Sequence, residues 1–374
     1  MKYYLIAGEP SGDLHGSRLI SALKEEDPQS EFRAWGGDLM QKSGAVLAKH
    51  IRDLAIMGIV QVLRRLPTIF RNFRFCHADI EAFKPDVIIL IDYSGFNLRI
   101  AKWAKEKGFS VFYFISPQVW ATRAGRVKKI KKYVDRMFVI LPFEEDFYKK
   151  YNYKVDFIGH PLLDNVAEHE KDAAFVQKMG TEKPIIALLP GSRRQEVKSI
   201  LSEMLKMVPK FPEYQFIIAG APTLPEEFYR PFLQKYPQVQ LVQGQTYNLL
   251  ANAEAALVTS GTATLETALF DVPEVVCYKT GPLFYWIVKQ IIKIPFISLV
   301  NIIMGRKIVA ELIQHELNED NLDLELKKIL NSEHREILRK DYADLRNKLG
   351  NRGAAKRAAK LIVEEIKANV KLKK

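Results

Sequence analysis

Two stretches decide the fold of this chain: YYLIAGEPSGD at residues 3–13 and IIALLPGSR at residues 185–193. Each is a short apolar run that ends in a turn with Gly and Ser and then enters a predicted helix. A strand, turn and helix in this order expose backbone N–H groups and the positive end of a helix dipole, which suit an anionic ligand. Because the two units begin roughly one domain length apart, we expect two α/β domains that face each other across a cleft.

The length and composition allow two folded domains. The chain has 374 residues, of which 48% are hydrophobic and 27% charged, the usual proportions of a globular protein. The two cysteines, Cys76 and Cys277, form no CxxC pair, so neither a disulfide framework nor a zinc site is expected and a cytoplasmic location is favoured. The apolar stretch 3–7 is too short for a signal peptide, and no run reaches the about 18 to 20 apolar residues of a membrane span.

The net charge of +12 predicts an acidic partner. Nucleic acid, a phosphorylated substrate and an anionic membrane surface all qualify, and the composition does not choose among them.

Apolar runs alternate with helical patterns along most of the chain, which predicts parallel sheets with helices on both faces. The predicted strands are 3–7, 87–91, 111–115 and 137–141 in the first half and 185–189, 215–219, 256–259 and 274–278 in the second. We expect a first domain over 1–165 and a second over 166–351. A final helix over 352–374 has an apolar face that is available to pack back on the first domain.

The second half contains two candidate phosphate-binding loops. In the first, Gly191 and Ser192 precede Arg193, whose guanidinium suits phosphate oxygens. In the second, a Ser260-Gly261-Thr262 turn follows a predicted strand and opens a helix that contains Glu266. The hydroxyls and N–H groups of that turn can hold a pyrophosphate, and Glu266 can accept from ribose hydroxyls. A simple capping box around Glu266 is the alternative interpretation. Neither a GxxxxGK[ST] nor a GxGxxG motif is present.

Asp92 comes directly after the predicted strand 87–91. Ligands of open α/β sheets bind at the carboxyl ends of the strands, so this carboxylate is a candidate general base, and a helix cap is the alternative. The seven histidines form no HExxH motif and a DxD pair is missing, so no metal site is expected.

Two stretches, 56–67 and 282–304, combine aromatic and aliphatic residues with flanking Lys and Arg. Such a composition is typical of helices that lie on a bilayer surface, although a buried core helix has a similar composition. The basic run at 123–132 fits either a membrane role or a solvated helix face. The predicted membrane-contact residues are Ile59, Val62, Leu63, Arg64, Arg65 and Leu66.

Seven motifs together resemble the lipid A disaccharide synthase family. They are AGEPSGD at 7–13, the Asp92 and FNL block at 91–98, SPQVWA at 116–121, FIGHP at 157–161, LPGSR at 189–193, SGTA at 260–263 and the SL…N…GR pattern at 298–306. The matches run in family order from residue 4 to about residue 310. One departure is that many family members have Pro-Asp where this chain has Ser94-Gly95, so a second acid near Asp92 is missing.

The resemblance implies a glycosyltransferase-B fold of two Rossmann-like domains, with the acceptor bound mainly by the first and a UDP-sugar by the second. It implies an inverting transfer that joins UDP-2,3-diacylglucosamine to 2,3-diacylglucosamine 1-phosphate (lipid X), giving a β-1,6-linked disaccharide 1-phosphate and UDP. It implies no cofactor and no nucleic acid, a peripheral position on the anionic inner membrane, and leaves a homodimer open. The implied catalytic residues are Asp92, as base, and Glu9. The substrate-binding candidates are Ser11, Gly12, Gly191, Ser192, Arg193, Ser260, Gly261, Thr262, Glu266, Asn301 and Arg306.

Two other functions stay open on the sequence. A UDP-N-acetylglucosamine 2-epimerase would share the scaffold but would have no use for lipid-facing stretches. A non-catalytic protein that binds anionic lipid or nucleic acid would need neither two phosphate loops nor an acid at a strand end.

Overall fold

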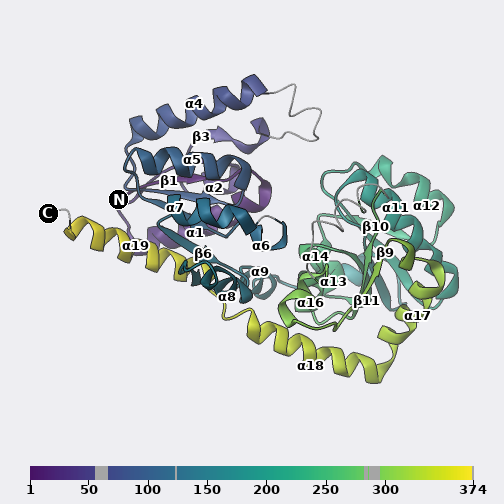
Figure 1. Cartoon of the computed structure of the whole chain (residues 1–374). Helices are drawn as coiled ribbons and strands as arrows, with labels where there is room; N and C mark the ends of the chain where they lie inside the picture. The colour runs from purple at the N-terminus through teal and green to yellow at the C-terminus, as the bar shows by residue number, and fades with distance from the viewer. Residues whose placement is uncertain (55–65, 123, 282–284, 286–294, 373–374) are drawn as a thin grey trace. The chain divides into compact units, whose positions relative to one another are not determined.

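The computed structural model describes residues 1–54, 66–122, 124–281, 285 and 295–372. The chain divides into two compact units (Figure 1). The first unit is Met1–Pro161 with Gly350–Lys374, and the second unit is Leu162–Leu349. Each has one parallel sheet, and the predicted α/β class is confirmed.

The sheet of the first unit has the strand order β3-β2-β1-β4-β5-β6-β7. Its strands are β1 (Lys2–Ile6), β2 (Glu31–Gly36), β3 (Val46–His50), β4 (Val87–Ile91), β5 (Val111–Phe114), β6 (Arg136–Val139) and β7 (Asp156–Phe157). The described helices are α1 (Pro10–Glu26), α2 (Asp38–Lys42), α4 (Leu66–Phe83), α5 (Ser94–Glu106), α6 (Val119–Thr122), α7 (Val127–Tyr133), α8 (Phe143–Lys149) and α19 (Ala354–Leu372), with 3-10 turns η1 (Ile51–Asp53) and η2 (Ala124–Arg126).

Alternate residues of β1 enter two different cores. Tyr3 and Leu5 pack on the face that α1 and α19 cover, while Tyr4 and Ile6 pack with residues of α4, α5 and α7. A parallel strand with helices on both sides is buried on both faces, so its sequence is continuously apolar rather than alternating. The apolar runs at 3–7 and 87–91 predicted strands for this reason.

The sheet of the second unit has the order β10-β9-β8-β11-β12-β13. Its strands are β8 (Ile185–Leu189), β9 (Gln215–Gly220), β10 (Gln240–Gln243), β11 (Ala253–Thr259), β12 (Glu274–Tyr278) and β13 (Ala310–Ile313). The described helices are α9 (Leu162–Ala167), α10 (Phe175–Lys178), α11 (Arg194–Met204), α12 (Arg230–Lys235), α13 (Thr246–Leu250), α14 (Thr262–Leu269), α16 (Leu299–Met304), α17 (Glu319–Leu330) and α18 (Ser332–Lys348), with 3-10 turns η3 (Leu205–Lys210), η4 (Glu226–Phe228) and η5 (Gln314–Glu316).

In both sheets the strand order reverses direction beside the first strand of the unit. The chain passes from β1 outward to β2 and β3 and then returns to β4 on the other side of β1; β8 and β11 are related in the same way. Connections between parallel strands are right-handed, so the helices after the two central strands leave toward opposite faces. The carboxyl ends of β1 and β4, and of β8 and β11, are therefore the places where a ligand can approach each sheet.

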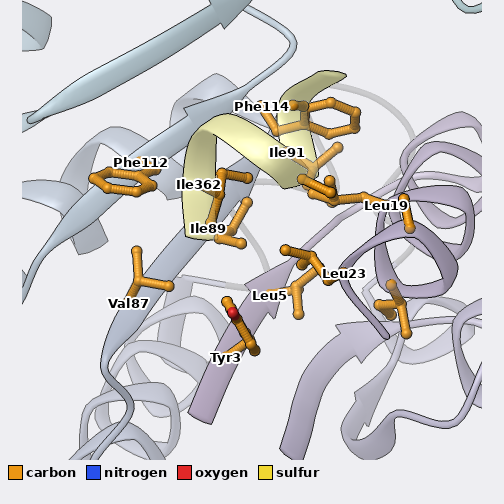
Figure 2. Packing of buried hydrophobic residues seen from close by; sticks show 14 of the residues in the cluster. Tyr3, Leu5, Leu19, Leu23, Val87, Ile89, Ile91, Phe112, Phe114 and Ile362 are labelled. Atoms are coloured by element: carbon orange, nitrogen blue, oxygen red, sulfur yellow. The ribbon is translucent and has the colours of Figure 1, made fainter. Parts of the chain in front are cut away.

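The C-terminal helix α19 completes the core of the first unit. Ala354, Ala358, Ile362 and Ile366 are buried in the same cluster as Leu5 and other residues of the central strands. In Figure 2 the Ile362 side chain lies beside Ile89, below Phe114. Helix α19, which follows the second unit in the sequence, thus packs in the same core as Tyr3 of β1.

Replacing Ile362 with Ala should lower the free energy of unfolding of the first unit by about 2 to 4 kcal/mol, because it leaves a cavity among packed side chains. Lys360 is exposed on the same helix, so Lys360→Ala should change this free energy by less than about 0.5 kcal/mol. Denaturant unfolding with hydrogen exchange of β1 and β4 amides measures both. Equal stability of the two variants would contradict the role of α19 in this core.

Candidate functional site

Glu9 and Asp92 lie together at the switch point of the first sheet. Glu9 precedes α1 in the turn after β1, and Asp92 follows β4 directly. The two strands are paired, with Ile6 opposite Leu90. The Glu9 carboxylate is close enough to raise the pKa of Asp92 and of Tyr93. The two residues proposed as catalytic are thus neighbours in the structure, although 83 positions separate them in the sequence (92 − 9).

The turn at Asp92 has a strained backbone. Asp92 and Tyr93 have φ angles of +42° and +43°, a left-handed conformation that side chains other than glycine rarely adopt. Such strain persists only where the surroundings hold it, and it concentrates at functional sites.

Asn97 and Tyr113 hold this turn through hydrogen bonds to backbone carbonyl oxygens. The buried Asn97 amide donates to the carbonyl oxygens of Asp92 at 2.9 Å, Ile91 at 3.1 Å and Ile6 at 3.3 Å. The Tyr113 hydroxyl also donates to the Asp92 carbonyl. These bonds tie the ends of β1 and β4 together and hold the backbone at Asp92.

Gly8 allows the two loops to close on each other. A Cβ at this position would collide with the ring of Tyr93, so only glycine lets the ring lie against the turn after β1. The Tyr93 ring also stacks on Phe96, with ring centroids 5.5 Å apart.

The pKa of the Asp92 carboxyl is raised above its usual value. Partial burial is the largest cause and the Glu9 carboxylate is the second, while a hydrogen bond from the Tyr93 backbone opposes both. The residue still reaches solvent. Because a carboxylate with a raised pKa accepts a proton more readily, Asp92 is suited to act as a general base above that pKa.

The SGD segment after Glu9 contains one solvent-facing residue and two structural ones. Ser11 is exposed in the first turn of α1. Gly12 is buried, and a Cβ there would lie 3.0 Å from the Ala7 Cβ, so its role is close packing of α1 on the sheet rather than ligand contact. Asp13 accepts hydrogen bonds from the backbone N–H groups of Gly37 at 2.7 Å and Met40 at 3.1 Å, which caps the start of α2.

Two loops meet at the switch point of the second sheet. Gly191 follows β8 with φ +102°, and a Cβ there would lie 3.1 Å from the Thr259 Cγ2 at the end of β11. Glycine is therefore required for the two loops to approach. Ser192 is exposed, and the Arg193 side chain is 81% exposed beside Glu196, at 2.8 Å.

The loop after β11 presents small polar groups at the start of α14. Gly261 has φ +152° and no side-chain cap, and both it and Thr262 are exposed. Ser260 Oγ donates to the carbonyl oxygen of Ile297 at 2.8 Å. The first backbone N–H groups of a helix have no partner within the helix, so this helix start is suited to an anion.

Glu266 lies in α14 and is not part of a capping box. Its carboxylate accepts from the Tyr247 hydroxyl at 2.9 Å, and the N-cap residue of the helix, Gly261, has no side chain to complete such a box. The capping alternative is therefore wrong. Burial raises the pKa of the Glu266 carboxyl, and the bond from Tyr247 opposes the shift.

Asn301 is a structural residue, contrary to the expectation that it binds substrate. Its side chain is fully buried. Its Nδ2 donates to Val309 O at 3.0 Å and Glu311 Oε1 at 2.9 Å, and its Oδ1 accepts from the backbone N–H groups of Ile308 at 2.8 Å and Val309 at 3.1 Å. Both donors and both acceptor positions of the amide are used within the second unit.

Arg306 also lies away from the candidate site. It follows α16, is paired with Asp341 of α18, and lines a cavity with Glu274. Glu274 begins β12 and Ala310 begins β13, so Arg306 is at the amino edge of the sheet. Ser260 and Gly191 are at the opposite, carboxyl edge, so the expectation that Arg306 binds substrate with them is wrong.

Most of the predicted membrane-contact residues cannot be described structurally. Ile59, Val62, Leu63, Arg64 and Arg65 lie outside the described residues. Leu66 is the first residue of α4, and its side chain is also outside the description.

The described parts of the two candidate membrane stretches differ. Helix α4 exposes Phe70 by 59% and Phe75 by 43%, with Arg71 and Arg74 exposed between them. In the second stretch α16 is core, since Val300, Ile303 and Met304 are buried, so the membrane interpretation is wrong for 299–304. Residues 282–284 and 286–294 of that stretch lie outside the described residues.

The sequence interpretation did not identify Tyr113, Asn97 or Tyr247 as parts of the site. Asn97 falls in the quoted FNL block, which was a usable signal. Tyr113 lies in the apolar run of β5, where its sequence context predicts an ordinary core residue. No pattern in the sequence around Tyr247 predicts a functional role for it.

Within the described ranges, no group of three His, Cys, Asp or Glu side chains has the arrangement of a metal site. Among the same residues, no helix is both long and apolar enough to cross a membrane.

Comparisons with known proteins match the whole chain. A family model described as lipid-A-disaccharide synthetase matches residues 3–366. A lipid-A-disaccharide synthase from Syntrophus aciditrophicus is 41% identical over 372 residues, which are 97% of each protein. One from Coxiella burnetii is 38% identical over 371 residues, 96% of each.

Solved structures share the fold at low sequence identity. UDP-GlcNAc 2-epimerase from Neisseria meningitidis, bound to UDP-GlcNAc, has a TM-score of 0.65 at 16% identity and covers 97% of this chain and 99% of its own. The glycotransferase of kitacinnamycin has a TM-score of 0.65 at 14% identity, with 97% and 98% covered. The predicted glycosyltransferase-B fold is confirmed.

Replacing Glu9 with Gln should lower the pKa of Asp92, because it removes a nearby like charge. NMR titration of the Asp92 carboxyl carbon, assigned with Asp92→Asn, measures the shift. Glu31 is exposed at the start of β2, so Glu31→Gln is a control that should leave the titration unchanged. If Glu9→Gln also leaves it unchanged, the two carboxylates are not coupled.

Proposed function

The chain belongs to the lipid-A-disaccharide synthetase family, and we propose that it joins UDP-2,3-diacylglucosamine to 2,3-diacylglucosamine 1-phosphate. It is a glycosyltransferase of lipid A disaccharide synthesis. In the proposed reaction the 6-hydroxyl oxygen of the acceptor attacks the anomeric carbon of the donor. The bond from that carbon to UDP breaks, and a β-1,6-linked disaccharide 1-phosphate and UDP are formed.

Asp92 is the proposed general base. Inversion by direct displacement requires that the acceptor hydroxyl lose its proton as the new bond forms, and the Asp92 carboxylate accepts that proton. The observation that carries this assignment is the pairing of Asp92 with Glu9 at the open edge of the first sheet, where burial and the Glu9 charge raise the Asp92 pKa. Asn97 and Tyr113 support the base through the Asp92 carbonyl.

The second unit is the proposed binding site for the UDP part of the donor. The exposed Ser192 and Arg193 and the N–H groups at the start of α14 carry the positive potential that a pyrophosphate needs. Glu266, held by Tyr247, is suited to accept from the ribose hydroxyls. As UDP leaves, the same groups stabilise the negative charge that develops on the pyrophosphate.

The fold does not distinguish the transferase from the epimerase alternative, because solved structures of both kinds of enzyme have similar TM-scores to this chain. The epimerase from Neisseria meningitidis is only 16% identical in sequence. The relatives at 37–41% identity carry the synthase name, which favours the transfer reaction.

Replacing Asp92 with Asn should lower turnover by about 10²- to 10⁴-fold, the usual contribution of a general base, and leave binding of UDP unchanged. Purified protein is incubated with both substrates in EDTA, and mass spectrometry quantifies the disaccharide 1-phosphate and UDP. Asp86 precedes the same strand at its other end and accepts from the Lys2 backbone N–H at 2.7 Å. Asp86→Asn is therefore a matched control.

Near-normal turnover of Asp92→Asn with an unchanged pH profile would contradict the role of Asp92. Consumption of UDP-sugar by the unaltered protein without disaccharide would instead indicate hydrolysis or isomerisation.

We also propose that the protein binds the anionic inner-membrane surface through α4 and the residues before it. The first support is the pair of exposed phenylalanines with exposed arginines on α4, a combination that favours an anionic interface. The second is that the proposed substrates have acyl chains.

The double variant Phe70→Ser, Arg74→Ser should weaken sedimentation with anionic vesicles by at least about tenfold, because it removes an apolar contact and a charge. Ile337 and Arg339 are both exposed on α18 of the second unit. Ile337→Ser with Arg339→Ser is the matched control and should bind vesicles normally. Equal binding of both double variants would mean that α4 does not contact the membrane.

A further inference from the structure

A basic groove lies between α5 and the turn and helix η2–α7 of the first unit. It is a cavity of about 410 Å³. From α5 its lining includes Ser94, Gly95, Arg99 and Lys102, and from the other wall Arg126 and Lys129. We call this cavity the α5–α7 groove.

The charge of the α5–α7 groove has one sign. Four of its eight lining residues are Arg or Lys, and none is Asp or Glu. Lys102 pairs with Glu106 at 3.8 Å, with both side chains exposed, and an exposed pair of this kind neutralises little of the potential. Walls of low dielectric concentrate such a potential inside a groove.

The cationic side chains are held in defined positions. Arg126 donates to the Ser94 hydroxyl at 3.2 Å, which bridges the two walls. The Arg99 guanidinium lies over the Phe73 ring, 5.6 Å from its centroid. At Gly95 no atom lies within 4 Å of the position that a Cβ would take, so this part of the groove is open.

The groove begins beside the proposed base. Ser94 and Gly95 are the second and third residues after Asp92, and they form the start of α5. In a hexose 1-phosphate the phosphate and the 6-hydroxyl are separated by about one sugar ring. A phosphate bound beside Ser94 and Gly95 lies next to the turn that carries Asp92.

We propose that the α5–α7 groove is the subsite for the phosphate monoester of the acceptor sugar, and that it orients the acceptor hydroxyl toward Asp92. This assignment rests on the proposed function and names the acceptor contact that the proposed function leaves open. A monoester dianion matches several cations in one cavity, and guanidinium groups bind its oxygens in a forked geometry.

The test compares two acceptors, 2,3-diacylglucosamine 1-phosphate and the same sugar without phosphate, both in detergent micelles. The double variant Arg99→Gln, Lys129→Gln should raise KM for the phosphorylated acceptor about 10- to 100-fold, as expected for the loss of two charge-assisted contacts. KM for the UDP-sugar and activity on the acceptor without phosphate should not change.

The matched control also removes two positive charges, both from positions on α7 outside the groove. Lys128 and Lys131 are exposed on α7 and do not line the cavity, so Lys128→Gln with Lys131→Gln should keep the KM of the unaltered protein. Thermal unfolding of both double variants separates a binding defect from a loss of structure.

Three outcomes would overturn the proposal. The first is an equal loss on both acceptors, which would mean that the groove does not recognise the phosphate. The second is an unchanged KM for the phosphorylated acceptor. The third is a defect found only on phospholipid vesicles and not in micelles, which would assign the groove to a lipid headgroup.

Direct binding keeps this test separate from the proposed reaction. Calorimetric titration of the phosphorylated acceptor into the unaltered protein and the Arg99, Lys129 variant measures the subsite without turnover. If the unaltered protein binds this acceptor but makes no disaccharide, the reaction assignment fails while the groove assignment stands. If both proteins bind it equally, the groove assignment fails.

Discussion

The reversal of strand order beside β1 and again beside β8 is the constraint on which both candidate sites depend. Right-handed connections send the chain to opposite faces of the sheet on the two sides of the reversal. The helices after β1 and β4, and after β8 and β11, therefore leave toward opposite faces, and the turns before them lie at the carboxyl edge of the sheet, where a ligand can approach. Glycine completes the arrangement at each edge: Gly8 admits the Tyr93 ring, and Gly191 admits Thr259.

The two switch points have opposite electrostatic character, and this difference suits a transfer reaction. In the first unit two carboxylates share one edge, and burial together with the Glu9 charge raises the pKa of Asp92. In the second unit an exposed arginine and a helix start provide a positive potential without a nearby unpaired acid in the same loops. The first arrangement suits the proposed removal of a proton, and the second suits the proposed stabilisation of a leaving pyrophosphate.

Several motif residues support the site without touching it. Asp13 caps α2, Gly12 sets the packing distance of α1, and the Asn301 amide is fully used in holding the segment before β13. Hydrogen bonds to such buried groups stabilise the unit, since a buried polar group left unpaired costs about 1–3 kcal/mol. A specific sequence pattern can therefore arise from hydrogen bonding inside a unit as well as from contact with a ligand.

The sequence by itself determined the class of fold, the central strands and the loops that carry Asp92, Arg193 and Ser260, because continuous apolar runs and glycine turns are local patterns. It missed β2, β3, β10 and β13, which are short, polar or at a sheet edge. Only the tertiary structure decided that Glu9 lies near Asp92 and that Tyr113 donates to the Asp92 carbonyl. It also decided that Ile362 packs in the core of the first unit, and that Arg306 lies at the amino edge of the second sheet, away from Gly191 and Ser260. These facts depend on which strands pair and which faces pack, and a local pattern contains no information about partners 21 or more positions away.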